Sequence, residues 1–333
     1  MDALLAESIE RLLAGCSTPA AVRQVEGGHG AAALWGGIEA SGYADLLVHE
    51  AAGGAGMGLR EAFTLWLACG RHALPVPLAA TVWVRAVLAA AGLTPPPGPL
   101  TLAVATRRDR DGALHCQDVP FGAVADWVLV DDVHAGMLLP VADAERRPSG
   151  VHGSLHAHLH WPALPAGAWV LPQHCDVVHA GALMTAALMA GAMQQVLAAT
   201  LAYANDRAQF GKSIGKFQAV QQQLSVMAEQ VFAARMAAEV GCAADGVAPH
   251  PLRAAVAKAR AGEAAEQVVA IAHAVHGAMG ATADYDLQLY TRRLQAWRAD
   301  FGAAPYWHAE LGRALLGARA ATLPFMLDEL LAR

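Results

Sequence analysis

The fold is decided by the stretch YANDRAQFGKSIGKFQAVQQQLSVM (Tyr203–Met227), which joins the end of one apolar helix to the beginning of another. The residues before it, Leu183–Ala204, are apolar on every side, which is typical of a helix buried in a core. After the loop, apolar side chains recur at helical spacing at Val220, Leu224, Met227 and Val231. An apolar helix, a glycine-containing loop and a second helix predict antiparallel neighbours in a helical bundle.

The loop within this stretch gathers hydrogen-bond donors. Arg207, Gln209 and Lys212 stand close together between two helices that we expect to be buried. Such a cluster favours an anionic acceptor, and a phosphate or a carboxylate matches a guanidinium best. An ordinary helix junction with solvated Arg and Lys side chains is the alternative that this chemistry leaves open.

The rest of the chain divides into three segments. Up to about Gly92 it reads as helices joined by glycine turns, and the run TPPPGP (Thr94–Pro99) then excludes a helix or a central strand. Beyond it, short β-like runs alternate with turn residues, and further helices are expected over Val256–Val275 and Trp307–Leu331. We therefore predict a mainly α protein with a small β domain: an N-terminal helical domain (1–95), a reduced middle β domain (96–172) and a C-terminal four-helix bundle (173–333).

Composition excludes several classes of protein. The 333 residues are 55% hydrophobic and 16% charged with a net charge of -6, which excludes disorder and argues against nucleic-acid binding. The five cysteines are scattered without a C-x-x-C pair, which is typical of reduced thiols in the cytosol. No signal-peptide pattern is found at the N-terminus, and the longest apolar run, Ala180–Met193, is shorter than the ~18–20 residues of a membrane span. We expect a cytoplasmic protein.

Histidines cluster in the segment VHGSLHAHLH. Three of them alternate along the chain, which would place them on one face of a strand: His156, His158 and His160. Imidazoles on one strand face could bind zinc or copper, but no carboxylate or cysteine completes a ligand set nearby. We predict surface histidines and no metal site.

The residue order in the donor loop resembles a motif of one enzyme family. Arg-x-Gln-Phe-Gly-Lys-x-Ile followed by Phe-Gln-x-Val-Gln is similar to the C-terminal-domain motif of acyl-CoA dehydrogenases. The resemblance implies that Arg207 and Gln209 reach across a dimer interface to the FAD of a neighbouring subunit. It also implies that Phe210, followed by Gly211, packs near the adenosine portion of that FAD.

A second block, HAVHGAMGATADYDLQLYTRR (His273–Arg293), is similar to the glycine-rich turn of the same family. The resemblance implies that Gly277 and Gly280 let the backbone contact the flavin pyrophosphate of the partner, and glycines do allow such close approach. Two residues depart from the family pattern. Ala278 stands at a usual glycine and Ala274 at a usual glutamine, so contact with the flavin from this turn is expected to be weaker.

The position that the resemblance assigns to the catalytic base holds no carboxylate. Acyl-CoA dehydrogenases remove an α-proton with a Glu or Asp whose pKa is raised by burial. Counting from Gly280 puts Phe301 at that position, and the alternative position used by some relatives falls near Gly181. Asp300, next to Phe301, is the remaining candidate base. Adjacent helical residues point about 100° apart, so we expect Asp300 to face elsewhere.

The β segment lacks further family residues. Anchoring on the step Ala125-Asp126-Trp127 places Asp118, Val119 and Pro120 where family members carry Trp-Ile-Thr beside the flavin. Proline removes both the hydroxyl and the backbone donor at that place. The sequence therefore argues against a self-contained pocket for FAD and substrate.

These features together imply one subunit of an FAD-dependent acyl-CoA dehydrogenase that desaturates an acyl-CoA at its α,β bond. The resemblance to two-subunit relatives acting on steroid side chains implies a non-catalytic partner, with FAD shared with a second acyl-CoA dehydrogenase-like subunit. Electron-transfer flavoprotein is the electron acceptor that the family implies. The alternatives are a complete homo-oligomeric enzyme with a displaced base, a flavin-free scaffold, and a flavin-dependent monooxygenase of the same fold.

Overall fold

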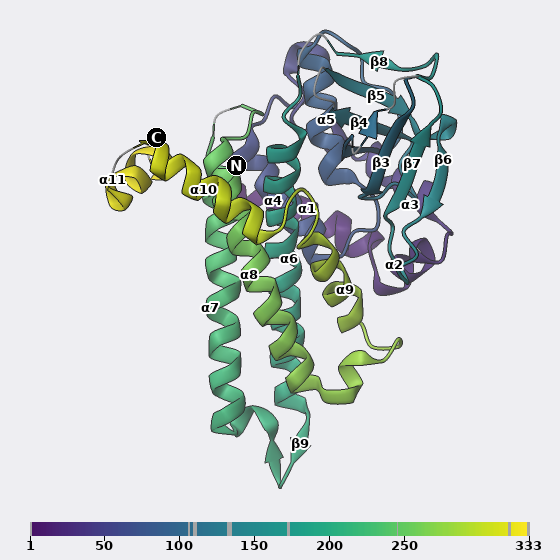
Figure 1. Cartoon of the computed structure of the whole chain (residues 1–333). Helices are drawn as coiled ribbons and strands as arrows, with labels where there is room; N and C mark the ends of the chain where they lie inside the picture. Colours follow the sequence, from purple (N-terminus) through teal and green to yellow (C-terminus); the bar gives the residue numbers. More distant parts are fainter. Residues whose placement is uncertain are drawn as a thin grey trace. The chain divides into compact units, whose positions relative to one another are not determined.

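The computed structural model describes residues 2–105, 107–108, 112–131, 135–171, 174–244, 246–318 and 321–331. The chain forms two compact units (Figure 1). Unit 1 comprises Met1–Leu65, Leu74–Gly181 and Ala244–Ala248, and unit 2 comprises Trp66–Ala73, Ala182–Ala243 and Pro249–Arg333.

Unit 1 begins with short helices, three of which are joined by a buried arginine. These are α1 (Asp2–Cys16), α2 (Pro19–Glu26), α3 (Ala31–Ala40), η1 (Tyr43–Asp45), η2 (Glu50–Ala52), the first part of α4 (Leu59–Arg71), and α5 (Leu78–Ala90). The side chain of Arg85 on α5 donates to Asp45 Oδ2 at 3.1 Å and also to Glu39. Burial is the largest single influence and would raise the pKa of Glu39, but the hydrogen bonds from Arg85 and Trp35 together with the positive charge of Arg85 outweigh it and lower the pKa.

Two four-stranded sheets complete unit 1. The first has the order β1 (Leu100–Val104), β4 (Trp127–Asp131), β5 (Gly136–Pro140) and β8 (Trp169–Val170), with β1 and β4 parallel. The second is antiparallel, in the order β2 (Arg107–Arg108), β3 (Leu114–Val119), β7 (Ala157–Trp161) and β6 (Glu145–Pro148), and η3 (Val141–Asp143) follows β5.

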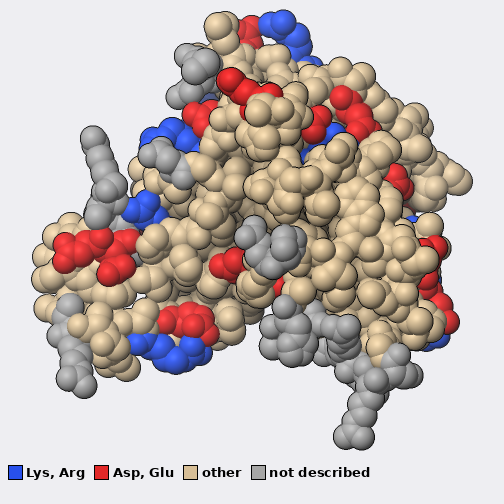
Figure 2. All heavy atoms as spheres, turned by 90° about the horizontal axis from the view of Figure 1, so that it is seen from above, with Lys and Arg blue, Asp and Glu red and all other residues tan. Residues whose placement is uncertain are grey.

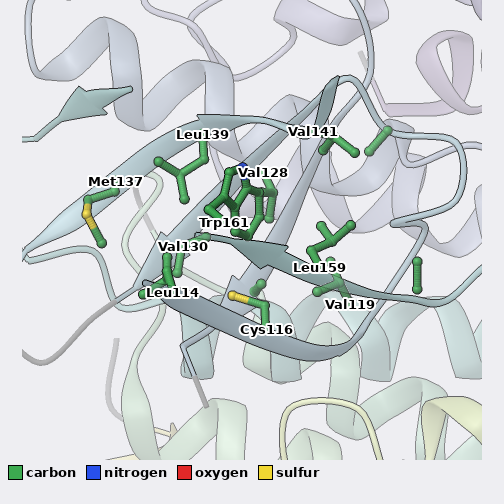
Figure 3. Packing of buried hydrophobic residues seen from close by; sticks show 13 residues of the cluster. Leu114, Cys116, Val119, Val128, Val130, Met137, Leu139, Val141, Leu159 and Trp161 are labelled. Carbon is green, nitrogen blue, oxygen red and sulfur yellow. The ribbon is translucent and has the colours of Figure 1, made fainter. Parts of the chain in front are cut away.

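The inward faces of both sheets form one apolar cluster (Figure 3). Val128 and Leu139 of the first sheet pack with Leu159 and Trp161 of the second, and none of the four is more than 1% exposed. Trp161 also donates its indole N–H to the carbonyl of Pro140 at 3.0 Å. The alternation of buried and half-buried residues along β7 follows from the period of two in a strand that buries one face.

Unit 2 is a helical bundle. Its elements are α6 (Val177–Asp206, with Ala182 onward in this unit), β9 (Ala208–Gln209), β10 (Lys212–Ser213), η4 (Ile214–Lys216), α7 (Gln218–Gly241), α8 (Pro251–His276), η5 (Gly277–Ala281), α9 (Leu287–Trp297), α10 (Ala304–Ala318), α11 (Thr322–Met326) and the π-helix η6 (Leu327–Leu331). Helices α7 and α8 pack along each other, and Figure 1 shows β9 beyond one end of them.

Helix α6 packs against the end of α4 at backbone distance. A Cβ added at Gly70 on α4 would lie 1.9 Å from the carbonyl oxygen of Leu188 on α6. Reciprocally, a Cβ added at Gly191 on α6 would lie 1.9 Å from the carbonyl oxygen of Leu67 on α4. The two glycines therefore allow a crossing that any side chain would push apart.

A buried lysine closes the turn between α9 and α10. Lys258 on α8 has 0% exposure, and its Nζ donates to the carbonyls of Arg298 at 3.1 Å and Gly302 at 2.9 Å. The indole N–H of Trp307 donates to the same Gly302 carbonyl at 3.1 Å. Burial lowers the pKa of Lys258 to about 8. Lys258 thus supplies a donor to the carbonyl of Arg298, the residue that caps α9, and a second donor to the carbonyl of Gly302 in the following turn.

The predicted fold class is confirmed: the chain is mainly α, with helices before and after a small β region. The expected single helix over Trp307–Leu331 is wrong, because α10 begins at Ala304 and ends at Ala318, and Ala321 is extended with a ψ of 149°. Pro324 cannot lie in the interior of a continuous helix but is tolerated in the first turn of a new one. Helix α9 is a further, separate helix that is not among those predicted from the sequence.

The burial of the most apolar helix and the distribution of charged side chains both concern contact with solvent. Helix α6 is long and apolar enough to cross a membrane, but 72% of its most apolar window is buried within the protein. On the face shown in Figure 2, acidic and basic side chains form small separate groups with uncharged surface between them.

The close crossing of α4 and α6 predicts that Gly191→Ala destabilises the protein. The new methyl group would meet the α4 backbone, so we expect a loss of about 1–3 kcal/mol in the free energy of unfolding. Gly36→Ala on α3 is the control, because a Cβ there has no neighbour within 4 Å. Urea unfolding followed by circular dichroism measures both, and equal midpoints for Gly191→Ala and the unsubstituted protein would contradict the close crossing.

The buried lysine predicts a pH dependence of stability. Between a folded pKa of about 8 and an unfolded pKa of 10.5, the unfolded chain holds a proton on Lys258 that the folded chain lacks. Stability attributable to Lys258 therefore rises with pH across this window, by at most about 1.4 kcal/mol per pH unit. Comparison with Lys258→Met by urea unfolding at several pH values cancels the other titrating groups. Parallel stability curves from pH 8 to 10.5 would show that Lys258 is not buried as described.

Candidate functional site

The donor loop forms a two-residue β-hairpin between α6 and α7. Strands β9 and β10 pair Gln209 with Lys212, and Ile214 donates its N–H to the carbonyl of Arg207 at 2.8 Å. The turn residues Phe210 and Gly211 both have positive φ, 54° and 78°. Two-residue hairpins favour such turns, but phenylalanine adopts positive φ rarely. The hairpin therefore holds Phe210 in a strained conformation at its tip.

The side chains of this hairpin face solvent. Arg207 and Gln209 are exposed, and Phe210 is 91% exposed. Lys212 instead places its Nζ 4.4 Å from the ring centroid of Phe217, in a cation–π contact. Within the described part of the chain, the side chains of Arg207 and Gln209 form no hydrogen bond or ion pair. Their donors remain available to a ligand or a partner.

The glycine-rich turn follows α8 at its C-terminus. Gly277 has φ 60° and ψ -145°, a conformation essentially restricted to glycine, and it is exposed. Gly280 is buried, and a Cβ added there would lie 2.8 Å from the Cβ of His276. Ala274 and Ala278, the two departures from the family pattern, are exposed. The exposed backbone of this turn could approach a phosphate group closely.

An aromatic contact joins the hairpin to the glycine turn. Tyr203, in the last turn of α6, stacks on His276 at a centroid distance of 4.4 Å and an interplanar angle of 29°. The Tyr203 hydroxyl donates to the carbonyl of His276 at 3.3 Å. The two predicted cofactor-binding segments, which carry Arg207 and Gly277, are thus brought together at one end of the bundle.

The predicted position of the base lies elsewhere in unit 2. Phe301 is half-buried in the turn between α9 and α10 and has a φ of 52°. Lys258 caps this turn from the second turn of α8, whereas His276 is the last residue of the same helix. At 1.5 Å per residue, Lys258 and His276 are separated by roughly 27 Å along the α8 axis. The base position and the donor hairpin of one chain are therefore far apart.

Neither of the two other positions considered for the base, Gly181 and Asp300, is suited to remove a proton from a substrate. Gly181 is buried within α6 and offers no carboxylate. Asp300 is half-buried in the same turn as Phe301 and raises the pKa of Lys258 by its negative charge. Its charge is thus engaged near Lys258. A role of Asp300 as base stays a prediction without structural support.

The segment that replaces the family Trp-Ile-Thr step is an irregular part of β3. The pairing of β3 with β7 shifts register between Cys116 and Val119, and Asp118 and Phe121 have positive φ of 47° and 57°. Thr101 donates its hydroxyl to the Pro120 carbonyl at 2.6 Å. The segment therefore combines strained backbone at Asp118 and Phe121 with a proline at position 120, which offers no hydroxyl.

The histidine segment lies on β7 and just before it. His158 and His160 alternate with buried residues, as expected for one strand face. His160 stacks on His115 of β3 at 4.2 Å and lies 3.2 Å from Glu145 of β6. Stacked rings direct their nitrogen lone pairs in parallel rather than toward one point. Within the described residues, no group of three or more His, Cys, Asp or Glu could hold a metal ion.

Sequence reasoning missed the residues that hold the site in place. Lys258 is a single lysine in the alanine-rich run AAVAKARA, and a charged residue on an otherwise apolar helix face is the signal that could have found it. Tyr203 and His276 were within the quoted motifs, but their contact joins residues 73 positions apart. Such a contact leaves no pattern in a single sequence.

Comparison with known proteins identifies the family. The protein-family model described as "Acyl-CoA dehydrogenase, C-terminal domain" matches residues 175–316 of this chain. Acyl-CoA dehydrogenase IpdE2 of Mycobacterium tuberculosis is 30% identical over 304 residues, which are 87% of this chain and 89% of that protein. IpdE2 of Mycolicibacterium smegmatis is 29% identical over 302 residues, 87% of this chain and 91% of that protein.

Solved structures share the fold over almost the whole length. A variant of the Tcur3481-Tcur3483 steroid ACAD is 26% identical with a TM-score of 0.80, covering 96% of this chain and 99% of that chain. The ChsE4-ChsE5 complex from Mycobacterium tuberculosis is 23% identical with a TM-score of 0.79, covering 96% and 98%. The family model, the relative that is 30% identical and the similar solved structure all point to the same family. This chain therefore belongs to the acyl-CoA dehydrogenase family.

Proposed function

We propose that this chain is the non-catalytic subunit of a two-subunit, FAD-dependent acyl-CoA dehydrogenase. In this assembly, Arg207 and Gln209 bind an FAD whose flavin ring is held mainly by the other subunit. The observation that carries the proposal is the contrast within unit 2. The exposed hairpin presents Arg207 and Gln209 without internal partners, whereas the base position holds Phe301.

The donor end of the bundle fits the pyrophosphate of a dinucleotide. A guanidinium is a planar fork of donors that matches phosphate oxygens in a bidentate way. Gly277 adds an exposed backbone that no Cβ shields. Phe210 offers an exposed aromatic face at the hairpin tip, where an adenine ring could stack. These groups suit the phosphate and adenosine portions of FAD, which supplies the hydride acceptor when bound.

The base position does not fit proton abstraction. Desaturation of an acyl-CoA requires a base within hydrogen-bond reach of the α-proton, and a phenylalanine cannot accept it. Lys258 does not replace the carboxylate, because its Nζ has no exposed surface and donates to two backbone carbonyls. The catalytic carboxylate of the assembly is therefore expected on the other subunit.

The separation of the two places favours use of the donors on a neighbouring subunit. Roughly 27 Å of α8 lies between the turn that contains Phe301 and the glycine turn. A group that bound at the hairpin of this chain would thus have its phosphates at one end of unit 2, remote from the base position of the same chain. Donors in such a place serve a cofactor whose ring lies in another subunit.

The structural relatives support the substrate class and the two-subunit arrangement. The names of two similar structures describe assemblies of two different chains, and one of them is described as a steroid ACAD. We infer that the substrate is an acyl-CoA thioester with a bulky, steroid-type acyl group. Electron-transfer flavoprotein would then reoxidise the flavin, and the cytoplasm is the expected location.

The proposal predicts that Arg207→Ala weakens FAD binding in the complex of this chain with its partner subunit. Loss of a charge-assisted hydrogen bond amounts to about 1.5–3 kcal/mol, which corresponds to roughly a ten- to hundredfold rise in Kd for FAD. The measurement is the flavin fluorescence released on dilution of the complex, made on this chain co-expressed with an acyl-CoA dehydrogenase-like product encoded beside it.

Arg11→Ala is the matched control, because Arg11 is an exposed arginine on α1 whose side chain pairs only with Glu7 in the described structure. We expect this variant to retain FAD as the unsubstituted complex does. Unchanged FAD retention in Arg207→Ala would contradict the role of the hairpin as a donor to FAD.

A further inference from the structure

The last turn of α6 has few contacts of its own. Leu201, Ala202, Asn205 and Asp206 are exposed, so Tyr203 and Ala204 carry the packing of this turn. Arg207 follows directly, and its N–H donates to the Tyr203 carbonyl at 2.9 Å. The position of Tyr203 therefore determines where the hairpin begins.

The hairpin is too short to be stable without support from the rest of unit 2. Its strands have two residues each, and an isolated two-stranded hairpin is marginally stable at best in water. The strain at Phe210, with its φ of 54°, adds to this. The ordered hairpin must be stabilised through its ends, and Tyr203 is at one of them.

The rings of His276 and Tyr285 pack against the ring of Tyr203. His276 is 3% exposed, and its Nδ1 lies 2.8 Å from the Ala272 carbonyl, to which it donates in the neutral tautomer. Tyr285 packs 5.2 Å from His276 and edge-on to Tyr203 at 6.2 Å. Burial lowers the pKa of His276, so the ring stays neutral between the two tyrosines.

The other ring nitrogen of His276 is also enclosed within the protein. Nε2 is buried and has no hydrogen-bond partner within the described residues. A protonated imidazole would place an unsatisfied N–H there, which is costly in a buried site. His276 therefore acts as a flat apolar surface that immediately precedes Gly277, with one polar contact to its own helix.

We infer that Tyr203 is a positioning residue that fixes the Arg207 hairpin to the glycine turn, so that both segments address the same pyrophosphate. The inference deepens the proposed function, on which it rests. Tyr203 acts in two ways: its ring stacks on His276, and its hydroxyl donates to the His276 carbonyl. Without the ring, the last turn of α6 frays and Arg207 samples many positions.

A double-mutant cycle in the FAD-loaded complex tests this inference. Tyr203→Leu removes the stacking and the hydrogen bond, and we expect it to raise the Kd for FAD about tenfold. Tyr203→Phe keeps the ring and should remain within about threefold of the unsubstituted complex, since a hydrogen bond of 3.3 Å contributes little. In the Arg207→Ala background, Tyr203→Leu should raise the Kd for FAD by clearly less than the tenfold effect it has in the unsubstituted complex, because part of the effect of Tyr203 is exerted through Arg207.

Hydrogen exchange on the chain itself gives a readout that is independent of FAD. We expect faster amide exchange across 204–214 in Tyr203→Leu and unchanged exchange in α8 up to 270. Tyr43→Leu, at a half-buried tyrosine in unit 1, is the control for loss of a tyrosine as such. If Tyr203→Leu exchanges faster throughout the bundle, the residue is structural and the inference is wrong.

The outcomes separate the inference from the proposed function. An Arg207→Ala complex with unchanged FAD binding overturns the proposed function. A strong effect of Arg207→Ala with no effect of Tyr203→Leu, or with additive effects in the double variant, overturns only the role of Tyr203. A Tyr203→Phe complex as weak as Tyr203→Leu would show that the hydroxyl, and not the stacked ring, fixes the hairpin.

Discussion

Helices α4 and α6 touch through their backbones, because Gly70 and Gly191 each leave room for a carbonyl of the other helix. This crossing sets the course of α6, the most apolar helix of unit 2. The direction of α6 in turn determines where its last turn ends and where the hairpin with Arg207 protrudes. The tight crossing tolerates no added methyl group, so the position of the donor hairpin depends on packing near the middle of the helix.

The turn that contains Phe301 is ordered although it holds no base. Lys258 and Trp307 donate to its carbonyls, and Phe301 adopts a positive φ of 52° within it. A buried lysine is costly unless it is fully hydrogen-bonded, so its presence shows how strongly the bundle determines this turn. The chain thus orders this turn around a side chain that cannot take a proton. The Phe301 side chain has no group that accepts a proton, whereas the exposed donors that we propose for FAD lie at the other end of α8.

Much of the architecture could be predicted from the sequence, because it rests on local patterns. The apolar run of α6, the hairpin loop and the glycine turn are contiguous segments, so Arg207, Gln209 and Gly277 could be named directly. The end of α10 was mispredicted because a break near Pro324 is not visible in apolar periodicity. The contacts of Lys258 with Gly302 and of Tyr203 with His276 join distant residues, and only the folded chain shows them. The residues of the candidate site could therefore be predicted in part and remain a prediction, whereas the contacts that hold them in place could not be predicted.

The central claim, that this chain shares one FAD with an unlike subunit, is tested most directly by flavin stoichiometry. The chain would be purified alone and as the complex with its co-expressed partner, and the FAD absorbance of each would be related to protein before and after addition of acyl-CoA. Sharing predicts a colourless chain alone and a yellow complex with one FAD per pair of unlike subunits, bleached by acyl-CoA. A yellow chain that is reduced by acyl-CoA without any partner would contradict the claim, and a colourless complex would leave only a scaffold role for this chain.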